Sequence, residues 1–174
     1  MLSLLQNFDS DSSMYASAKS SDTKNSDDAS YGPAFLFDGV VDNSGSANNW
    51  ITQSNAVHPW AEIAFTEAVD IKAIEFTTYG AENVLNFKNI DIRAGLNGTS
   101  LAHHGPSDNL ITDNPVHAHY IGPNTLGQVV YVTFSKPIKT QFLLIQAVNL
   151  NSHLMLAELK VIECKYRHLF NRFH

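Results

Sequence analysis

Short apolar or alternating runs, separated by turn residues, follow one another from Tyr31 onward. Alternation with period two, as at Ile90 and Ile92, combined with β-branched and aromatic residues, is typical of strands. The run at 142–147 is apolar at nearly every position, which predicts a central strand buried on both faces. The predicted strands cover residues 60–65, 70–77, 87–94, 129–134, 142–147 and 155–162.

The two ends of the chain have a different pattern. Residues 9–30 are rich in Ser and Asp, which predicts a polar loop or a disordered arm. Apolar residues near Tyr15 interrupt this segment and are able to form a short edge strand. At the C-terminal end, four aromatic or apolar residues with helical spacing predict a short amphipathic tail that packs on the domain or docks on a partner: Tyr166, Leu169, Phe170 and Phe173.

This pattern favours an all-β protein. Six or more short strands with loop-rich connections predict an antiparallel sandwich or jelly roll. A chain of 174 residues suits one domain. We expect an arm at 1–14, a β-sandwich domain at 15–163 and a basic, aromatic tail at 164–174.

Charge and cysteine content narrow the range of partners. Eleven Lys and Arg against 17 Asp and Glu give a net charge of −6, whereas proteins that track nucleic acid or anionic lipid usually carry a basic excess. No apolar run reaches the roughly 20 residues that span a bilayer, and the first residues show no secretory signal. Cys164 is the single cysteine, so no internal disulfide forms.

Three groups of segments, in order, carry a family resemblance. They are YGPAFLFDG at 31–39 with NNWIT at 48–52, PWAEIAF at 59–65, and FLLIQ at 142–146 with HLMLAELKV at 153–161. Together they resemble the discoidin domain, the coagulation-factor (F5/8) type C domain of the galactose-binding-domain-like superfamily, over about residues 15–163. The resemblance implies an eight-stranded, jelly-roll-like sandwich whose loops at one end bind sugars, lipid heads or proteins. It favours an extracellular or cell-surface location, with a cytosolic one left open.

The resemblance also implies a structural Ca²⁺ ion, as in related fucose lectins and family 32 carbohydrate-binding modules. The matching ligands are the side chains of Asp38 and Glu158 and the carbonyls of Phe35, Val40 and Ala157. Carboxylate and carbonyl oxygens suit this hard cation. The alternative is that Asp38 only caps its turn and Glu158 is a solvated strand residue.

Two ligand classes of the family are disfavoured. The fucose lectins use one His and two Arg, but residues 77–85 contain no Arg and Ile51 stands at the matching His position. Members that bind anionic membranes insert apolar residues of the first loop. Here residues 20–30 are acidic and contain no aromatic residue, so no membrane insertion is expected.

Glycan binding without catalysis is the predicted function, with glycans or glycoproteins as partners. A sugar site needs an aromatic platform and nearby hydrogen-bonding groups, and Tyr79 is the candidate platform. Weak single sites would favour a homo-oligomer through avidity. The alternative is a protein-interaction or cell-adhesion module without sugar affinity. The other candidate site residues are Asn55, His58, Glu82, Asn83, Asn151 and His153.

Histidine pairs raise the alternative of a metal-dependent enzyme. Residues 103–104 form one pair, and His117 and His119 would share a face of a strand. However, Pro123 occupies the position where the cupin pattern places a Glu. The chain also contains none of the common nucleophile, phosphate-loop or zinc-protease motifs. We therefore expect a protein that is not an enzyme.

Overall fold

The computed structural model describes residues 14–41, 48–80, 87–105, 109–122, 125–150 and 152–164. Its strands are β1 (Tyr15–Ser20), β2 (Trp50–Ile51), β3 (Trp60–Thr78), β4 (Ile90–Gly95), β5 (Val116–Tyr120), β6 (Val129–Ala147) and β7 (Met155–Glu163). Three short helical turns, η2 (Lys24–Ser26), α1 (Asp28–Tyr31) and η3 (Pro33–Leu36), lie between β1 and β2. The strand pairs are antiparallel, which confirms the predicted all-β class.

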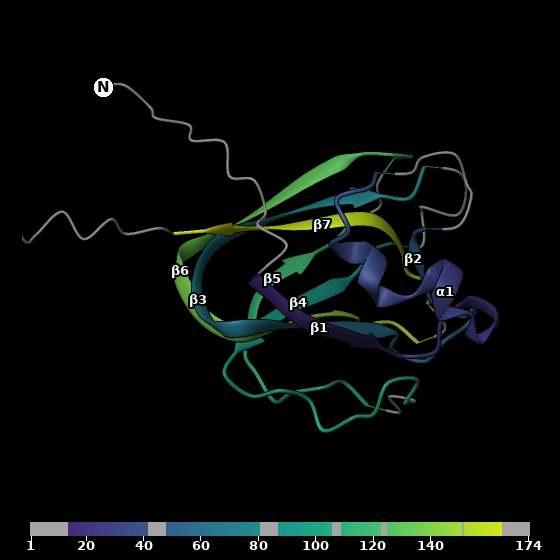
Figure 1. Ribbon diagram of the computed structural model, residues 1–174, viewed down its shortest axis with the longest axis horizontal. Coiled ribbons are helices and arrows are strands. Elements are labelled where there is room, and N and C mark those ends of the chain that lie inside the picture. Colours follow the sequence, from purple (N-terminus) through teal and green to yellow (C-terminus); the bar gives the residue numbers. More distant parts are fainter. Residues whose placement is uncertain are drawn as a thin grey trace, which may run out of the picture.

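The two long strands β3 and β6 pass through both layers of the sandwich. Their sheet has the order β2-β7-β3-β6-β4-β5, with β1 paired to β3. The pairing of β3 with β6 is irregular between Ala64 and Val69, and both strands curve there (Figure 1). Runs predicted as separate strands at 60–65 and 70–77 are therefore one bent strand, and the same is true of 129–134 and 142–147. This merging leaves seven strands in the described residues, where the resemblance implied eight.

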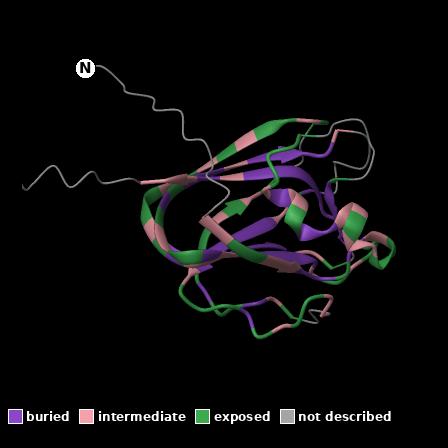
Figure 2. Cartoon of the chain, viewed as in Figure 1, coloured by how far each residue is buried: buried purple, intermediate pink, exposed green. Residues whose placement is uncertain are grey.

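The core lies between the two layers, as the purple strand segments of Figure 2 show. Its members include Trp50, Phe76, Ile92 and Leu159, all nearly or fully buried. Trp60 is also fully buried, so both tryptophans are core residues, as is common for large aromatic side chains.

The described parts of the 96–115 segment, residues 96–105 and 109–115, cover the outer face of one layer. Ile111 and Leu101 from this segment pack on Trp60 and Leu144. Buried Glu62 holds this segment against the sheet, because its carboxylate accepts a hydrogen bond from the Thr99 N–H at 2.8 Å. Strand β6 is consequently buried on both faces from residue 143 to 147, which confirms the prediction for a central strand.

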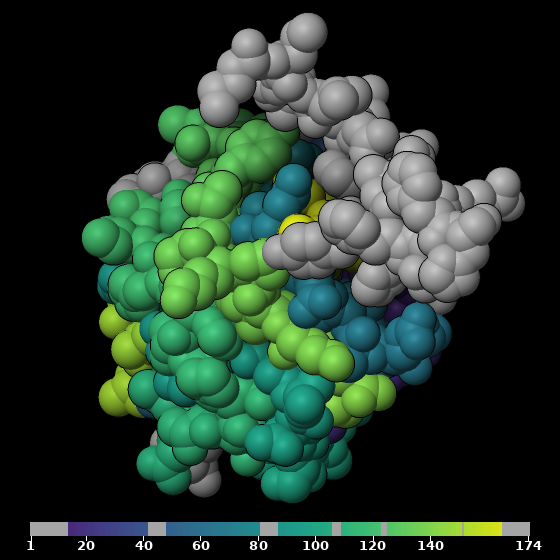
Figure 3. Space-filling model, turned by 90° about the vertical axis from the view of Figure 1, so that its left-hand side faces the viewer, coloured from purple at the N-terminus to yellow at the C-terminus, as the bar shows by residue number. Residues whose placement is uncertain are grey.

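The first half of β6 contributes exposed side chains to the surface, among them Val129 and Tyr131. Side chains of β6, in green, extend along much of the face in Figure 3. The short edge strand expected near Tyr15 is β1, which pairs with β3. The helical turns between β1 and β2, and strand β5, were not predicted. Among the described residues, no helix is long and apolar enough to cross a membrane.

Candidate functional site

Two turns lie side by side at the end of the sandwich where β2 leads into β3. Ala56 of the first turn and Ser152 of the second form an antiparallel bridge, and Ser152 N–H donates to the Ala56 carbonyl at 3.0 Å. Thr23, in the loop after β1, pairs with Thr52 in the same way. We call this region, built from residues 22–31, 52–59, 148–150 and 152–153, the loop end.

The structure places several predicted sugar ligands at the loop end. Asn55 is exposed and has a left-handed backbone with φ 61°. His58 is half-buried, and its Nδ1 lies 3.3 Å from the Ala147 carbonyl oxygen. His153 is partly buried beside Ser152. The paired turns thus bring these three residues to one region, while Glu82, Asn83 and Asn151 lie outside the described residues.

Tyr79 lies beneath this surface rather than on it. Its exposed fraction is 5%, and it packs with Ile51 and Met155 against the partly buried Tyr31. The Lys24 ammonium lies 5.0 Å from the centroid of the Tyr31 ring. In this conformation the Tyr79 ring forms part of an apolar floor, and Tyr31 is the more exposed aromatic ring. Sequence alternation does not distinguish these two roles, because both tyrosines border strands or turns.

Two of the predicted calcium ligands, Asp38 and Glu158, lie close together beside strand β7. Asp38 is exposed and its Oδ1 accepts a hydrogen bond from the Val40 N–H at 2.8 Å. Gly39 between them has φ 79°, in the left-handed region that suits the glycine of an Asp-Gly turn. Phe35 lies in η3 and Ala157 lies in β7, next to Glu158.

Glu158 is 1% exposed, which shows that it is not a solvated strand residue. Neither of its carboxylate oxygens makes a hydrogen bond of ordinary geometry with the described residues. Burial, followed by the nearby Asp38 carboxylate, raises the pKa of Glu158 to about 8, against weaker opposing effects of Lys160 and the Gly39 N–H. A buried carboxyl without partners is costly, and a cation beside it would remove that cost.

The histidines of β5 have other partners. His119 Nδ1 lies 2.8 Å from Asp91 Oδ1, and His117 Nε2 lies 3.1 Å from the Ala94 carbonyl oxygen. His117 also contacts the Phe134 ring edge-on. No group of three metal-ligating side chains forms around them among the described residues.

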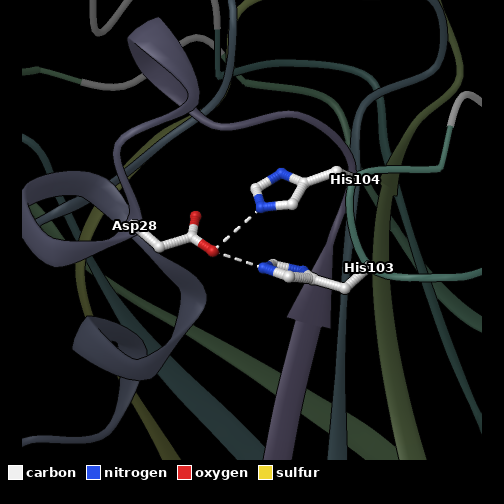
Figure 4. Close-up of side chains that lie close together, drawn as sticks. All are labelled: Asp28, His103 and His104. Atoms are coloured by element: carbon white, nitrogen blue, oxygen red, sulfur yellow. Dashed lines mark hydrogen bonds and ion pairs between the residues drawn. The ribbon is translucent and has the colours of Figure 1, made fainter.

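A different group of side chains converges around Asp28, at the first position of α1. His103 and His104 both direct Nε2 at its Oδ2 (Figure 4). The His-His pair is visible in the sequence, but its carboxylate partner is 75 residues away from His103. Only the chain fold brings these groups together.

Comparison with known proteins identifies the family. The model for the F5/8 type C domain matches residues 16–159. The chain therefore belongs to the F5/8 type C, or discoidin, family. No match was found among proteins of curated function.

Solved structures with the same fold include several lectins and carbohydrate-binding modules. A fucolectin from striped bass serum has a TM-score of 0.73 at 17% identity, over 91% of this chain and 50% of that chain. A His 62 mutant of the lectin domain of Lectinolysin, complexed with Lewis b, has a TM-score of 0.68 at 16% identity, over 91% and 99%. The family 32 module of C. perfringens NanJ, in complex with galactose, has a TM-score of 0.63 at 21% identity, over 86% and 93%. The chain spans half the length of the striped bass protein.

Proposed function

We propose that this domain is a non-catalytic carbohydrate-binding module that recognises glycans at the loop end. Its family and the glycan-binding neighbours support this proposal. The observation that carries it is the arrangement of paired turns, which set polar side chains above the apolar floor of Ile51, Tyr79 and Met155. A sugar offers hydroxyl groups to such a polar rim and an apolar ring face to an aromatic side chain.

Within this region we propose that exposed side chains hydrogen-bond the sugar hydroxyl groups and that Tyr31 packs against the sugar ring. Asn55 and Gln53 are exposed on the first turn. Gln53 also fixes the neighbouring loop, since its Oε1 accepts the Asn25 N–H at 3.2 Å. Tyr79 supports the surface from below, packed with Ile51 and Met155.

The test is a glycan array with protein of measured oligomeric state, run in Ca²⁺ and again in EDTA. We expect specific binding that Asn55→Gly abolishes, because glycine keeps the left-handed backbone and removes only the amide. Asn89→Gly is the matched control, since Asn89 has φ 52°. Binding should survive that change.

The aromatic residues need a different pair of variants. Tyr31→Ala should weaken binding, whereas Tyr131→Ala, which removes a ring that is 63% exposed on β6, should leave it unchanged. Tyr79→Phe keeps the packing and tests the hydroxyl alone. If the folded protein binds no glycan on the array, this result would refute glycan binding and favour the protein-interaction alternative.

We also propose that Asp38 and Glu158 hold a structural Ca²⁺ ion. The buried carboxyl of Glu158, whose oxygens make no hydrogen bond of ordinary geometry with the described residues, and the adjacent Asp38 fit a hard cation that prefers oxygen ligands. Carbonyls of Phe35, Val40 and Ala157 are the candidate additional ligands. The ion would supply charge neutralisation and a link between the Asp38 turn and β7, with no part in chemistry.

A further inference from the structure

The loop that contains His103 and His104 is docked along the free edge of β1. Ser20 makes two backbone contacts with it: its N–H donates to His103 Nδ1 at 3.0 Å, and its carbonyl accepts the His104 N–H at 2.8 Å. Lys19 Nζ donates to the Thr99 carbonyl at 2.6 Å and to the Leu101 carbonyl at 3.1 Å. These four contacts hold the histidine pair against the segment that carries Asp28.

The three side chains place their donor atoms at one point. Asp28 Oδ2 contacts His103 Nε2 and lies 3.0 Å from His104 Nε2. The ligand atoms all lie within 4.8 Å of one another, and Figure 4 shows both rings directed at the same oxygen. Thr23 Oγ1 donates to the other oxygen, Oδ1, at 2.7 Å, which orients the carboxylate with Oδ2 toward the histidines.

We propose that Asp28, His103 and His104 form a binding site for a divalent first-row transition metal, with Zn²⁺ as the defining probe. Two imidazole nitrogens and one carboxylate oxygen are a ligand set typical of such metals and unsuited to Ca²⁺. The three side chains are 35–37% exposed, so water can reach the site and complete the coordination shell.

A carboxylate lies near the second nitrogen of His104. Its Nδ1 makes no hydrogen bond among the described residues and lies 3.6 Å from Asp22 Oδ1, within ion-pair range. A metal-bound imidazole commonly directs its second nitrogen at a carboxylate, which orients the ring and raises its basicity. Asp22 and Asp28 also give this corner a negative charge that attracts a dication.

His103 limits the affinity of the site. Because the Ser20 N–H donates to its Nδ1, the neutral ring carries its proton on Nε2, the atom that must bind the metal. Metal binding at Nε2 therefore requires the other tautomer, in which the proton has moved to Nδ1, and this breaks the Ser20 hydrogen bond. Loss of one such bond lowers affinity by about tenfold. We expect a weaker site than a four-ligand structural zinc site, with a binding signal at the Ser20 amide.

The experiment is a calorimetric titration of Zn²⁺ into the full chain with Ca²⁺ in large excess, so that the oxygen site is filled throughout. One equivalent should bind. Asp28→Asn and His104→Gln should each weaken binding by more than about 100-fold, beyond the usual effect of losing an outer-sphere partner. His117→Gln is the matched control and should bind like the unaltered chain, because His117 lies outside the cluster.

Cys164 is a competing zinc ligand, so the titration is repeated with Cys164→Ser, which should change nothing. Zinc X-ray absorption of the unaltered chain gives a readout that does not depend on variants folding. A shell of nitrogen and oxygen with imidazole scattering is expected, together with a shifted Ser20 amide resonance. A sulfur neighbour near 2.3 Å, no binding, or affinity insensitive to both Asp28→Asn and His104→Gln would overturn the proposal.

Discussion

The Asp38–Glu158 pair and the Asp28–His103–His104 cluster both bring carboxylates to the junction of distant chain segments, but in opposite environments. Glu158 is buried, and burial with the Asp38 charge raises its pKa to about 8. Asp28 is only partly buried. That burial alone would raise its pKa, but hydrogen bonds from His103 and Thr23 and the two nearby imidazoles together lower it.

This difference shows how a fold separates two kinds of cation chemistry. A buried carboxyl with an adjacent carboxylate favours a proton or a hard cation. A solvent-accessible carboxylate with imidazole partners is already stabilised as an anion, and its nitrogen neighbours favour a transition metal. The four predictions below test this contrast: the first two concern the larger effects at Glu158, and the last two the smaller effects at Asp22 and Asp28.

Glu158→Gln should change stability in opposite directions with and without calcium. Calcium at 1,000 times its dissociation constant would add about 4 kcal/mol to the free energy of unfolding of the unaltered chain, and this gain should disappear in the variant. In EDTA above about pH 8, the variant should be the more stable protein, because it buries no charge. Thermal and urea unfolding measure both effects.

Glu67→Gln, at an exposed position of β3, is the control. It should change neither the stability gain from Ca²⁺ nor the stability in EDTA. Equal destabilisation by Glu158→Gln in Ca²⁺ and in EDTA would argue against an ion at this pair.

The calcium-free protein should lose stability as pH rises from about 4.5 to about 8, the unfolded and folded pKa values of Glu158. Over this range the folded state keeps a proton that the unfolded chain releases, so the free energy of unfolding decreases with pH. The full span corresponds to at most roughly 5 kcal/mol. Urea unfolding across this pH range in EDTA measures it, and a flat profile that Glu158→Gln leaves unchanged would contradict the raised pKa.

Asp22→Asn should have a smaller effect, and it should affect zinc binding alone. Loss of the carboxylate behind His104 Nδ1 should lower zinc affinity by about tenfold and leave calcium stabilisation unchanged. Parallel titrations with Zn²⁺ and Ca²⁺ measure the two effects. A change in calcium response would mean that the two sites are coupled.

Asp28→Asn in metal-free protein should have the smallest effect. The lowered pKa of Asp28 stabilises the fold above the usual carboxyl range, and this contribution is lost as pH falls through the folded pKa. Since the side chain is 37% exposed, solvent screening limits the effect at neutral pH to about 1 kcal/mol or less. Asp70→Asn, exposed at the bend of β3, is the control, and a larger loss that persists in acid would indicate a packing defect instead.

Local pattern alone predicted much of the fold. Alternation identified the strands of the core, and the apolar run at 142–147 correctly indicated burial on both faces. It did not predict that this run and 129–134 form one strand, because a bend in β6 depends on its pairing with β3. The Asp-Gly turn at Asp38 was predictable because its φ is a local property of two residues.

The candidate sites depended more on the tertiary structure. Resemblance to a family indicated Asp38 and Glu158, but the burial of Glu158 follows from the packing of β7. Tyr79 was predicted as a platform, whereas contacts with Ile51 and Met155 place it in the floor.

The sequence by itself determined the all-β class, the positions of most strands, the left-handed Asp-Gly turn and the presence of a histidine pair. These properties depend on residues that are neighbours along the chain. Only the tertiary structure decided that Asp28 meets His103 and His104, and that Glu158 loses its solvent. Contacts across 75 residues and burial of single carboxyls arise when strands pair and loops dock, so no local pattern contains them.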